Sequence, residues 1–183
     1  MKTLILGGAK SGKSLFAENL ALQSRKKLVY IATALAGDAE MEQRILLHQQ
    51  RRRQQVIKWS TIEEPIALAK VLLSLAENAN ALSMDNKQLI LVDCLTLWLS
   101  NLLLNLDEKQ RKVEIDALFE VLQIINIEVI FVSNETGLGI VPMNLLSRQF
   151  IDLAGGLHQR MATVSERVIL TVAGLPLILK GTL

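Results

Sequence analysis

The stretch GGAKSGKS, residues 7–14, has the residue types and spacing of a phosphate-binding loop. It matches the pattern G-x-x-x-x-G-K-[ST], whose fixed positions are here Gly7, Gly12, Lys13 and Ser14. Glycines let the backbone wrap around phosphate oxygens, so that successive N–H groups face the anion. In such a loop Lys13 reaches the outer phosphates and the Ser14 hydroxyl ligates Mg²⁺. A chance glycine-rich turn is the alternative, but the apolar run before the loop and the amphipathic run after it favour nucleotide binding.

Asp93 is a second candidate, because it directly follows the apolar run LILV, residues 89–92. A P-loop protein needs an acidic group at the end of a neighbouring strand to hold the metal shell. Since the carboxyl ends of parallel strands share one edge of a sheet, we expect Asp93 at the same edge as the phosphate loop. We interpret Asp93 as a metal or nucleotide ligand, with a role as the N-cap of the next helix as the alternative.

A basic stretch, RILLHQQRRR, places one of the two histidines before three arginines at residues 44–53. Arg44 and His48 are four residues apart, so on a helix they lie on nearly one face, one turn apart. An imidazole nitrogen can act as a nucleophile toward phosphorus, while arginines neutralise the charge that develops. On spacing alone, a solvated helix end with an ordinary histidine is the more common arrangement.

The elements that must position these residues alternate between apolar strand-like runs and amphipathic helix-like runs, which predicts an α/β protein with a mainly parallel sheet. Strands are expected at 3–6, 28–32, 89–92, 129–133 and 168–172, with a weaker one at 177–179. Helices are expected at 13–24, 39–52, 65–76, 95–104, 109–125 and 144–162. Pro65 suits the first turn of its helix, and the polar stretch 77–88 suits a surface loop. The length of 183 residues fits a single domain, residues 1–183.

Composition argues against several classes of protein. A formal net charge of +2 and an aromatic content of 4% are too low for a nucleic-acid-binding surface. The apolar run 89–106 approaches the length of a membrane span, but an aspartate at bilayer depth costs ~2.5 to 3.5 kcal/mol, so Asp93 argues for a buried strand and helix instead. The single cysteine, Cys94, is compatible with a reducing compartment, and the start of the chain does not read as a signal peptide. We therefore expect no membrane span and a cytoplasmic location.

Beyond the phosphate loop, the chain carries an ordered set of motifs: YIATALAGDAEMEQRILLHQQRRR, WSTIEEP, LVDCLTLWLSNLL and NETGLGIVP. Over residues 4–180 this set resembles the bifunctional adenosylcobinamide kinase and adenosylcobinamide-phosphate guanylyltransferase family of cobalamin biosynthesis. The resemblance implies a P-loop NTPase fold of the recombinase type, a homotrimer and two reactions. Adenosylcobinamide is first phosphorylated from ATP or GTP. GMP from GTP is then joined to that phosphate, giving adenosyl-GDP-cobinamide and pyrophosphate.

The resemblance also implies roles for residues at matching positions. It makes His48 the residue that is guanylylated by attack on the α-phosphorus of GTP, with Lys13 as the second catalytic residue. It implies Mg²⁺ held by Ser14 and Asp93. Nucleotide contacts are implied at Gly7, Gly8, Ala9, Lys10, Ser11, Gly12, Lys13, Ser14, Ala32, Thr33, Ala34, Gln49, Gln50, Arg51, Arg52, Glu63 and Asp93.

Some of these positions have other interpretations. Glu63 is also suited to be a first-turn acid of the following helix. We expect the glycine-containing stretch 134–142 to border the cobinamide or the phosphates, with a structural turn as the alternative. The chain departs from the family's usual pattern at His158, where Asn is usual, and at Lys10, where Arg is usual and gives bidentate geometry.

Two other functions remain open. One is a single-activity P-loop enzyme, such as a small-molecule kinase. The other is a non-catalytic nucleotide switch that uses the same loop without a covalent histidine. Label on the protein from α-labelled GTP distinguishes guanylyl transfer from both a kinase alone and a switch.

Overall fold

A seven-stranded sheet runs through the part of the chain described by this computed structural model, residues 1–35, 43, 46, 47, 50, 52, 58–80 and 88–182. Its order is β3-β2-β4-β5-β1-β6-β7, and β7 runs antiparallel to β6 while the other neighbouring pairs are parallel. The strands are β1 (Lys2–Gly7), β2 (Lys27–Ala32), β3 (Trp59–Glu63), β4 (Gln88–Asp93), β5 (Glu128–Asn134), β6 (Arg167–Val172) and β7 (Leu175–Lys180).

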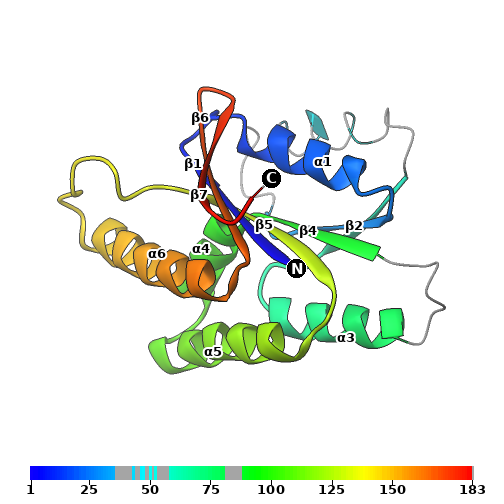
Figure 1. Ribbon diagram of the computed structural model, residues 1–183. Coiled ribbons are helices and arrows are strands. Elements are labelled where there is room, and N and C mark those ends of the chain that lie inside the picture. The colour runs from blue at the N-terminus through cyan, green and yellow to red at the C-terminus, as the bar shows by residue number, and fades with distance from the viewer. Residues whose placement is uncertain are drawn as a thin grey trace.

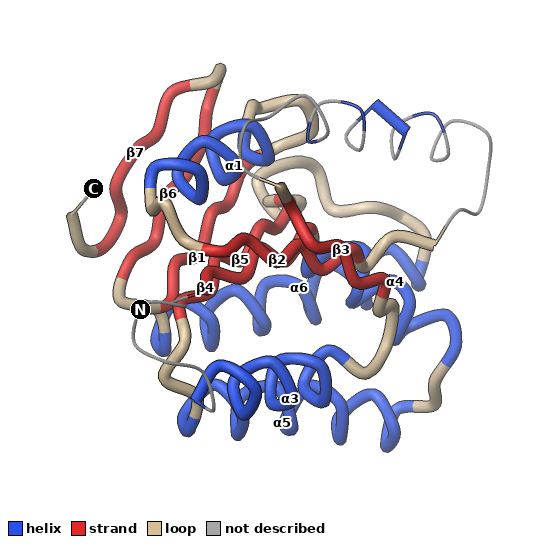
Figure 2. Tube along the Cα trace, turned by 90° about the vertical axis from the view of Figure 1, so that its right-hand side faces the viewer, coloured by secondary structure: helices blue, strands red, loops and turns tan. Residues whose placement is uncertain are grey.

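Helices cover both faces of this sheet, as Figures 1 and 2 show. On one face lies α1 (Lys13–Gln23). On the other lie α3 (Leu68–Asn80), α4 (Leu95–Asn105), α5 (Glu108–Ile124) and α6 (Leu145–Val164). Each parallel crossover returns the chain so that the carboxyl ends of the parallel strands meet at one edge, which is where loops of α/β proteins bind ligands.

The core lies in two layers, one on each side of the sheet. In β1, Leu4 belongs to the layer beneath α3 to α6, and the next residue, Ile5, belongs to the layer beneath α1. Both side chains are fully buried. Near-continuous apolar strands are expected when a parallel sheet is covered on both faces. Among the described residues, the largest fully buried side chain is Trp98 of α4, whose indole N–H donates to the carbonyl of Ile66 at 2.8 Å.

The expected α/β fold is confirmed, and each of the six expected strands is present with slightly longer bounds. The apolar run 89–106 forms β4 and most of α4, and no helix in the described ranges is both long and apolar enough to cross a membrane. Of the helix expected at 39–52, residues 43, 46, 47, 50 and 52 are helical, and the rest lies outside the described residues.

Strand β3 was missed from the sequence. It pairs only with β2, at the edge of the sheet. Its Ser60 and Thr61 are exposed, so the strand shows no apolar run or clean alternation that would have marked it.

Two predictions about the segment around α3 are wrong. The helix begins at Leu68 rather than at Pro65, because a turn precedes it in which the Glu64 carboxylate accepts from the N–H groups of Ile66 and Ala67 at 2.9 and 2.7 Å. The stretch 77–88 is not all loop, since α3 continues to Asn80 and β4 begins at Gln88, while 81–87 lie outside the described residues.

Candidate functional site

The phosphate loop connects the end of β1 to the start of α1 at the carboxyl edge of the sheet. Gly12 is the N-cap of α1 and lies in the left-handed region with φ of 91°. The start of α1 therefore offers N–H donors and the positive end of a helix dipole to an anion. Lys13 folds over this loop, and its Nζ donates to the carbonyl of Gly8 at 3.1 Å. The sequence prediction of a strand, a glycine-rich loop and a helix in this order is confirmed.

The end of β6 and the turn between β6 and β7 pack against the phosphate loop. The N–H of Gly174 donates to the carbonyl of Ser11 at 2.8 Å. A Cβ on Gly7 would lie 2.6 Å from the carbonyl oxygen of Thr171, and one on Gly12 would lie 3.1 Å from the Cα of Gly174. Glycine is therefore needed at position 7 for packing and at position 12 because of its left-handed φ.

Asp93 ends β4 at the same edge of the sheet, as expected, but not on a strand next to β1. Strand β5 lies between β4 and β1, so Asp93 faces Val132 in the register while Gly7 faces Asn134. The expectation of a directly neighbouring strand is therefore wrong. The alternative of a helix cap is also wrong, because the N-cap of α4 is Cys94.

The carboxylate of Asp93 is oriented by Tyr30 of β2, whose hydroxyl donates to Oδ2 at 3.2 Å. Burial and the negative charge of Asp93 raise the pKa of Tyr30 well above its ordinary value, so this hydroxyl stays protonated at neutral pH. Burial also raises the pKa of the Cys94 thiol to about 11, with Asp93 adding to the shift and the Lys13 ammonium opposing it. A buried neutral thiol beside Asp93 agrees with a packing role for Cys94.

The segment that follows β2 is tied to the start of α4. The Thr33 hydroxyl donates to the carbonyl of Cys94 at 2.7 Å and accepts from the Cys94 N–H at 2.9 Å. The Asn101 amide donates to the carbonyl of Thr33 at 2.8 Å. Because Thr33 is fully buried, its hydroxyl holds this junction together. Ala32 and Ala34, the other implied contacts here, are half-buried at the same edge.

Glu63 ends β3 at the same edge, paired in register with Ala32, and it is exposed. It is not a first-turn acid of a helix, because α3 begins only at Leu68. The neighbouring Glu64 makes the local turn contacts instead. Glu63 is thus left as an exposed carboxylate at the edge that carries the phosphate loop.

The basic stretch is described only in part. His48, Gln49 and Arg51 lie outside the described residues, whereas Gln50 is helical and exposed. Arg52 is buried with 6% of its surface exposed, and its guanidinium lies 3.6 Å from the centroid of the Tyr30 ring. A buried cation over an aromatic face contributes about 1 to 2 kcal/mol.

Arg52 also faces a carboxylate on the other side. Its Nη1 lies 3.7 Å from Oε1 of Glu18, a fully buried residue of α1. Arg52 is therefore held against α1 and β2, on the face of the sheet that carries the phosphate loop's helix. Glu18 belongs to none of the motifs identified in the sequence, and Tyr30 opens one of them without any role being predicted for it.

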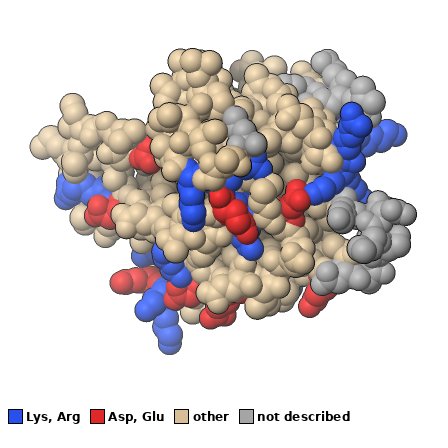
Figure 3. Space-filling model, viewed as in Figure 1, with Lys and Arg blue, Asp and Glu red and all other residues tan. Residues whose placement is uncertain are grey.

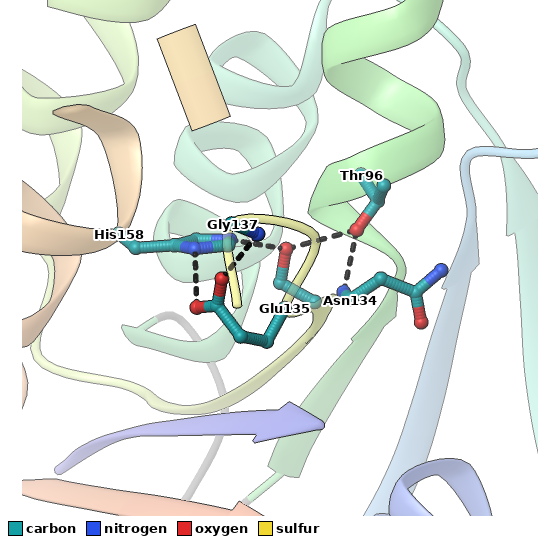
Figure 4. Close-up of polar contacts among 6 residues, drawn as sticks. Thr96, Asn134, Glu135, Gly137 and His158 are labelled. Carbon is teal, nitrogen blue, oxygen red and sulfur yellow. Dashed lines mark hydrogen bonds and ion pairs between the residues drawn. The ribbon is translucent and has the colours of Figure 1, made fainter. Parts of the chain in front are cut away.

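A chain of polar contacts lies at the end of β5 (Figure 4). The N–H of Asn134 donates to Oγ1 of Thr96 at 2.6 Å. Thr96 Oγ1 lies 3.0 Å from the Ser133 hydroxyl, which lies 2.8 Å from Nε2 of His158. His158 Nδ1 lies 3.6 Å from Oε2 of Glu135. The contacts join α4, β5 and α6 beside the phosphate loop.

The donor and acceptor roles in this series of hydrogen bonds follow from the protonation state of His158. Burial lowers the pKa of His158, against the opposing effect of Glu135, so the ring is neutral at neutral pH. A carboxylate beside Nδ1 requires the N–H there, which makes Nε2 an acceptor. Ser133 therefore donates to His158, and Thr96 donates to Ser133. His158 is thus a buried member of this network.

The residues present fit a magnesium ion bound together with nucleotide. Mg²⁺ prefers oxygen ligands and usually keeps water and substrate phosphates in its shell, with only one or two protein ligands. The Ser14 hydroxyl and the Asp93 carboxylate are donors of this kind at one edge of the sheet.

Solved structures of other proteins share this fold. An ATPase domain superposes with a TM-score of 0.52 at 13% identity, covering 92% of this chain and 68% of that one. A protein from Pyrococcus horikoshii superposes with a TM-score of 0.57 at 10% identity, covering 100% and 87%. At these identities the likeness concerns the fold alone, and it confirms the P-loop fold.

Sequence comparisons define the family. A model described as cobinamide kinase / cobinamide phosphate guanyltransferase matches residues 3–179. The chain is 53% identical over 181 residues to the bifunctional adenosylcobalamin biosynthesis protein CobP of Pseudomonas aeruginosa, covering 99% of this chain and 98% of that protein. It is 32% identical over 188 residues to the bifunctional adenosylcobalamin biosynthesis protein CobU of Escherichia coli, covering 96% and 97%. The chain therefore belongs to the cobinamide kinase / cobinamide phosphate guanyltransferase family, a family of enzymes.

Proposed function

We propose that this enzyme phosphorylates adenosylcobinamide from ATP or GTP and then transfers GMP from GTP to the phosphate it has made, through a guanylyl group on His48. The observation that supports this most is that the phosphate loop, Asp93 and the end of β2 lie together at the carboxyl ends of the parallel strands. Arg52 packs on Tyr30 of the same strand β2. Arg52, which follows His48 by four residues in the sequence, is itself held beside α1 and β2.

In the kinase step, the phosphate loop binds the triphosphate and Lys13 neutralises charge on its outer phosphates. The acceptor hydroxyl attacks the γ-phosphorus, the bond to the bridging oxygen breaks, and the nucleoside diphosphate leaves. Mg²⁺ held by Ser14 and Asp93 would supply a positive charge to the phosphate oxygens. Tyr30 keeps the Asp93 carboxylate oriented toward this edge.

In the transfer step, a ring nitrogen of His48 attacks the α-phosphorus of GTP and pyrophosphate leaves. An oxygen of adenosylcobinamide phosphate then attacks the same phosphorus, the P–N bond breaks, and His48 is regenerated. The two steps act at different phosphorus atoms. The nucleotide or the basic stretch must therefore move between them, or the two nucleotides must bind in different ways.

The loop between β5 and α6 suits the cobinamide side of the site. It projects from the molecule in Figure 1 and carries exposed apolar side chains, with Leu138 82%, Ile140 97% and Met143 96% exposed. In Figure 3 the same projection is free of charged side chains over most of its surface. Exposed apolar clusters of this kind mark binding surfaces. We propose that this loop borders the corrin ring, and that the enzyme acts as a homotrimer.

Product analysis tests the proposed function. With adenosylcobinamide, Mg²⁺ and ATP, we expect adenosylcobinamide phosphate, and with GTP added we expect adenosyl-GDP-cobinamide, both detected by liquid chromatography and mass spectrometry. Lys13→Ala should make neither. If the parent protein hydrolyses GTP slowly but modifies no cobinamide, the nucleotide-switch alternative is correct. Formation of the first product alone would identify a kinase only. Sedimentation of the purified enzyme tests the trimer.

A further inference from the structure

A cavity of about 290 Å³ lies at the amino ends of the strands, at the opposite edge of the sheet from the phosphate loop. Its lining residues come from the starts of β1, β4, β5 and β6, from the end of α1 and from the turn that follows α1. Thr3 lines the cavity and precedes Gly7 by four residues on β1, which at about 3.3 Å per residue separates the two by roughly 13 Å. The cavity is therefore distinct from the edge that carries the phosphate loop.

The side chain of Arg167 is buried in the wall of this cavity, with 8% of the residue's surface exposed. Arg167 pairs in register with Thr3 at the start of β6. It shares a face of the strand with Ile169, two residues on, which belongs to the core layer beneath α1. The strand thus directs the guanidinium toward the cavity on the α1 face of the sheet.

The guanidinium of Arg167 lacks the kind of partner that a buried cation usually has. Its Nη2 donates to Sδ of Met1 at 3.4 Å, and a thioether is a weak acceptor. Its Nε is closed to solvent without a partner, whereas Nη1 is not closed off and has no partner among the described residues either. No described carboxylate lies within 4 Å of this group, and that of the neighbouring Glu166 accepts from the N–H of Lys2 instead. Because buried charges in proteins are normally paired, Arg167 is suited to bind an anion from outside the chain.

The charges around the cavity favour an anion with a single negative charge. Lys26 and Glu128 also line the cavity, but they form an ion pair with each other at 2.5 Å, so their charges cancel. The end of α1 at Gln23 adds the negative end of a helix dipole. A dianion such as phosphate would meet too little positive charge here, whereas one carboxylate matches the planar fork of one guanidinium.

Apolar side chains form much of the remaining wall. Leu20 of α1, Leu89 of β4 and Ile130 of β5 all belong to the core layer beneath α1 or pack against it. Ligand pockets are typically apolar with a few polar groups that fix orientation, and they measure ~300 to 1,000 Å³. A cavity of about 290 Å³ has the volume of roughly ten water molecules, so it suits a small molecule rather than a nucleotide.

We propose that this cavity binds a small carboxylic acid, whose carboxylate lies against Arg167 and whose apolar body lies against Leu20, Leu89 and Ile130. The inference does not depend on the proposed function, because the cavity shares no residue with the phosphate loop. The two sites are connected by one helix, since α1 begins at the phosphate loop and ends at the cavity. A bound acid stabilises the folded protein, because the unfolded chain has no such site.

Benzoate and benzamide test this site, because they have nearly the same shape and only benzoate carries a charge. Saturation-transfer NMR measures the affinity of each for the full-length protein, with Mg²⁺ and the β,γ-imido analogue of GTP present to occupy the nucleotide site. We expect benzoate to bind, and benzamide to bind about tenfold more weakly, because a hydrogen bond between two charged groups is lost. Arg167→Met removes the charge but keeps a long unbranched side chain, and it should weaken benzoate by a similar factor. Arg160→Met, at an exposed arginine of α6, is the matched control and should leave benzoate binding unchanged.

Leu20→Trp is a second variant that leaves Arg167 in place, and its larger ring should fill the cavity and abolish benzoate binding. It decides the question if Arg167→Met does not fold. A parent protein that does not bind benzoate, or unchanged binding by either variant, would overturn the site. Equal affinity for benzoate and benzamide would remove the role of Arg167. Displacement of benzoate by inorganic phosphate at the same concentration would indicate a general anion site and overturn the choice of a carboxylic acid.

Discussion

The guanidinium of Arg52 lies 3.6 Å from the centroid of the Tyr30 ring, while the hydroxyl of the same tyrosine donates to Asp93. One side chain thus connects the basic stretch that contains the proposed nucleophile with the acid proposed to hold the metal. The two functions of the enzyme need both regions at one edge of the sheet. We propose that Tyr30 supports both the kinase and the transferase parts of the site.

Replacing Tyr30 by Phe tests the orientation of Asp93 separately from the packing of Arg52. The ring stays in place, so the Arg52 contact and the melting temperature should be nearly unchanged. Loss of the hydroxyl frees the carboxylate, and a hydrogen bond worth ~0.5 to 1.5 kcal/mol predicts a two- to tenfold lower kinase rate at limiting Mg²⁺. Measuring rate against Mg²⁺ concentration checks this. A metal dependence identical to that of the parent would show that Tyr30 does not orient Asp93.

His158 should make the stability of the protein depend on pH. Burial lowers its pKa from the ordinary value of 6.5, so in the window below 6.5 the unfolded chain binds a proton that the folded protein does not. The contribution of His158 to the free energy of unfolding is fully present above pH 6.5 and is lost as the pH falls below it. We expect the melting temperature to decrease from pH 7 to pH 5, and to decrease less in His158→Asn, which cannot titrate. Equal decreases in both proteins would remove His158 as the cause.

Gly7→Ala should disrupt the phosphate loop, because its Cβ would lie 2.6 Å from the backbone oxygen of Thr171. Relief of such overlap requires the loop or the end of β6 to shift, and overpacking typically costs ~1 to 3 kcal/mol. Gly8→Ala is the matched control, since a Cβ there meets no atom within 4 Å. Urea unfolding compares the two. A Gly7→Ala variant as stable as Gly8→Ala would mean that the end of β6 does not constrain the loop.

The local parts of this fold were predictable from sequence. The phosphate loop was found because its spacing, strand and helix are contiguous, and buried strands such as β4 were found because apolar runs covered on both faces carry a strong signal. The edge strand β3 carried no such apolar signal in the sequence, since Ser60 and Thr61 face solvent. The start of α3 was misplaced because the Glu64 turn, rather than Pro65, determines where the helix begins.

The support of the site was not predictable, because it depends on contacts between residues far apart in the chain. Glu18, Tyr30 and Arg52 come from three elements and meet only after folding. The separation of Asp93 from β1 by β5 is likewise a property of strand order, which a single sequence does not encode locally. Such relationships leave no periodicity or motif to detect.

The central claim is that His48 carries GMP during transfer, and the intact mass of the protein tests it most directly. The purified enzyme is incubated with Mg²⁺ and GTP beside His48→Ala and beside His158→Asn, which alters the only other histidine. Folding of each variant is verified by its melting temperature. We predict a gain of one GMP on the parent and on His158→Asn, and none on His48→Ala. A gain that persists in His48→Ala, or no gain on a parent that binds GTP, would contradict a guanylyl group on His48.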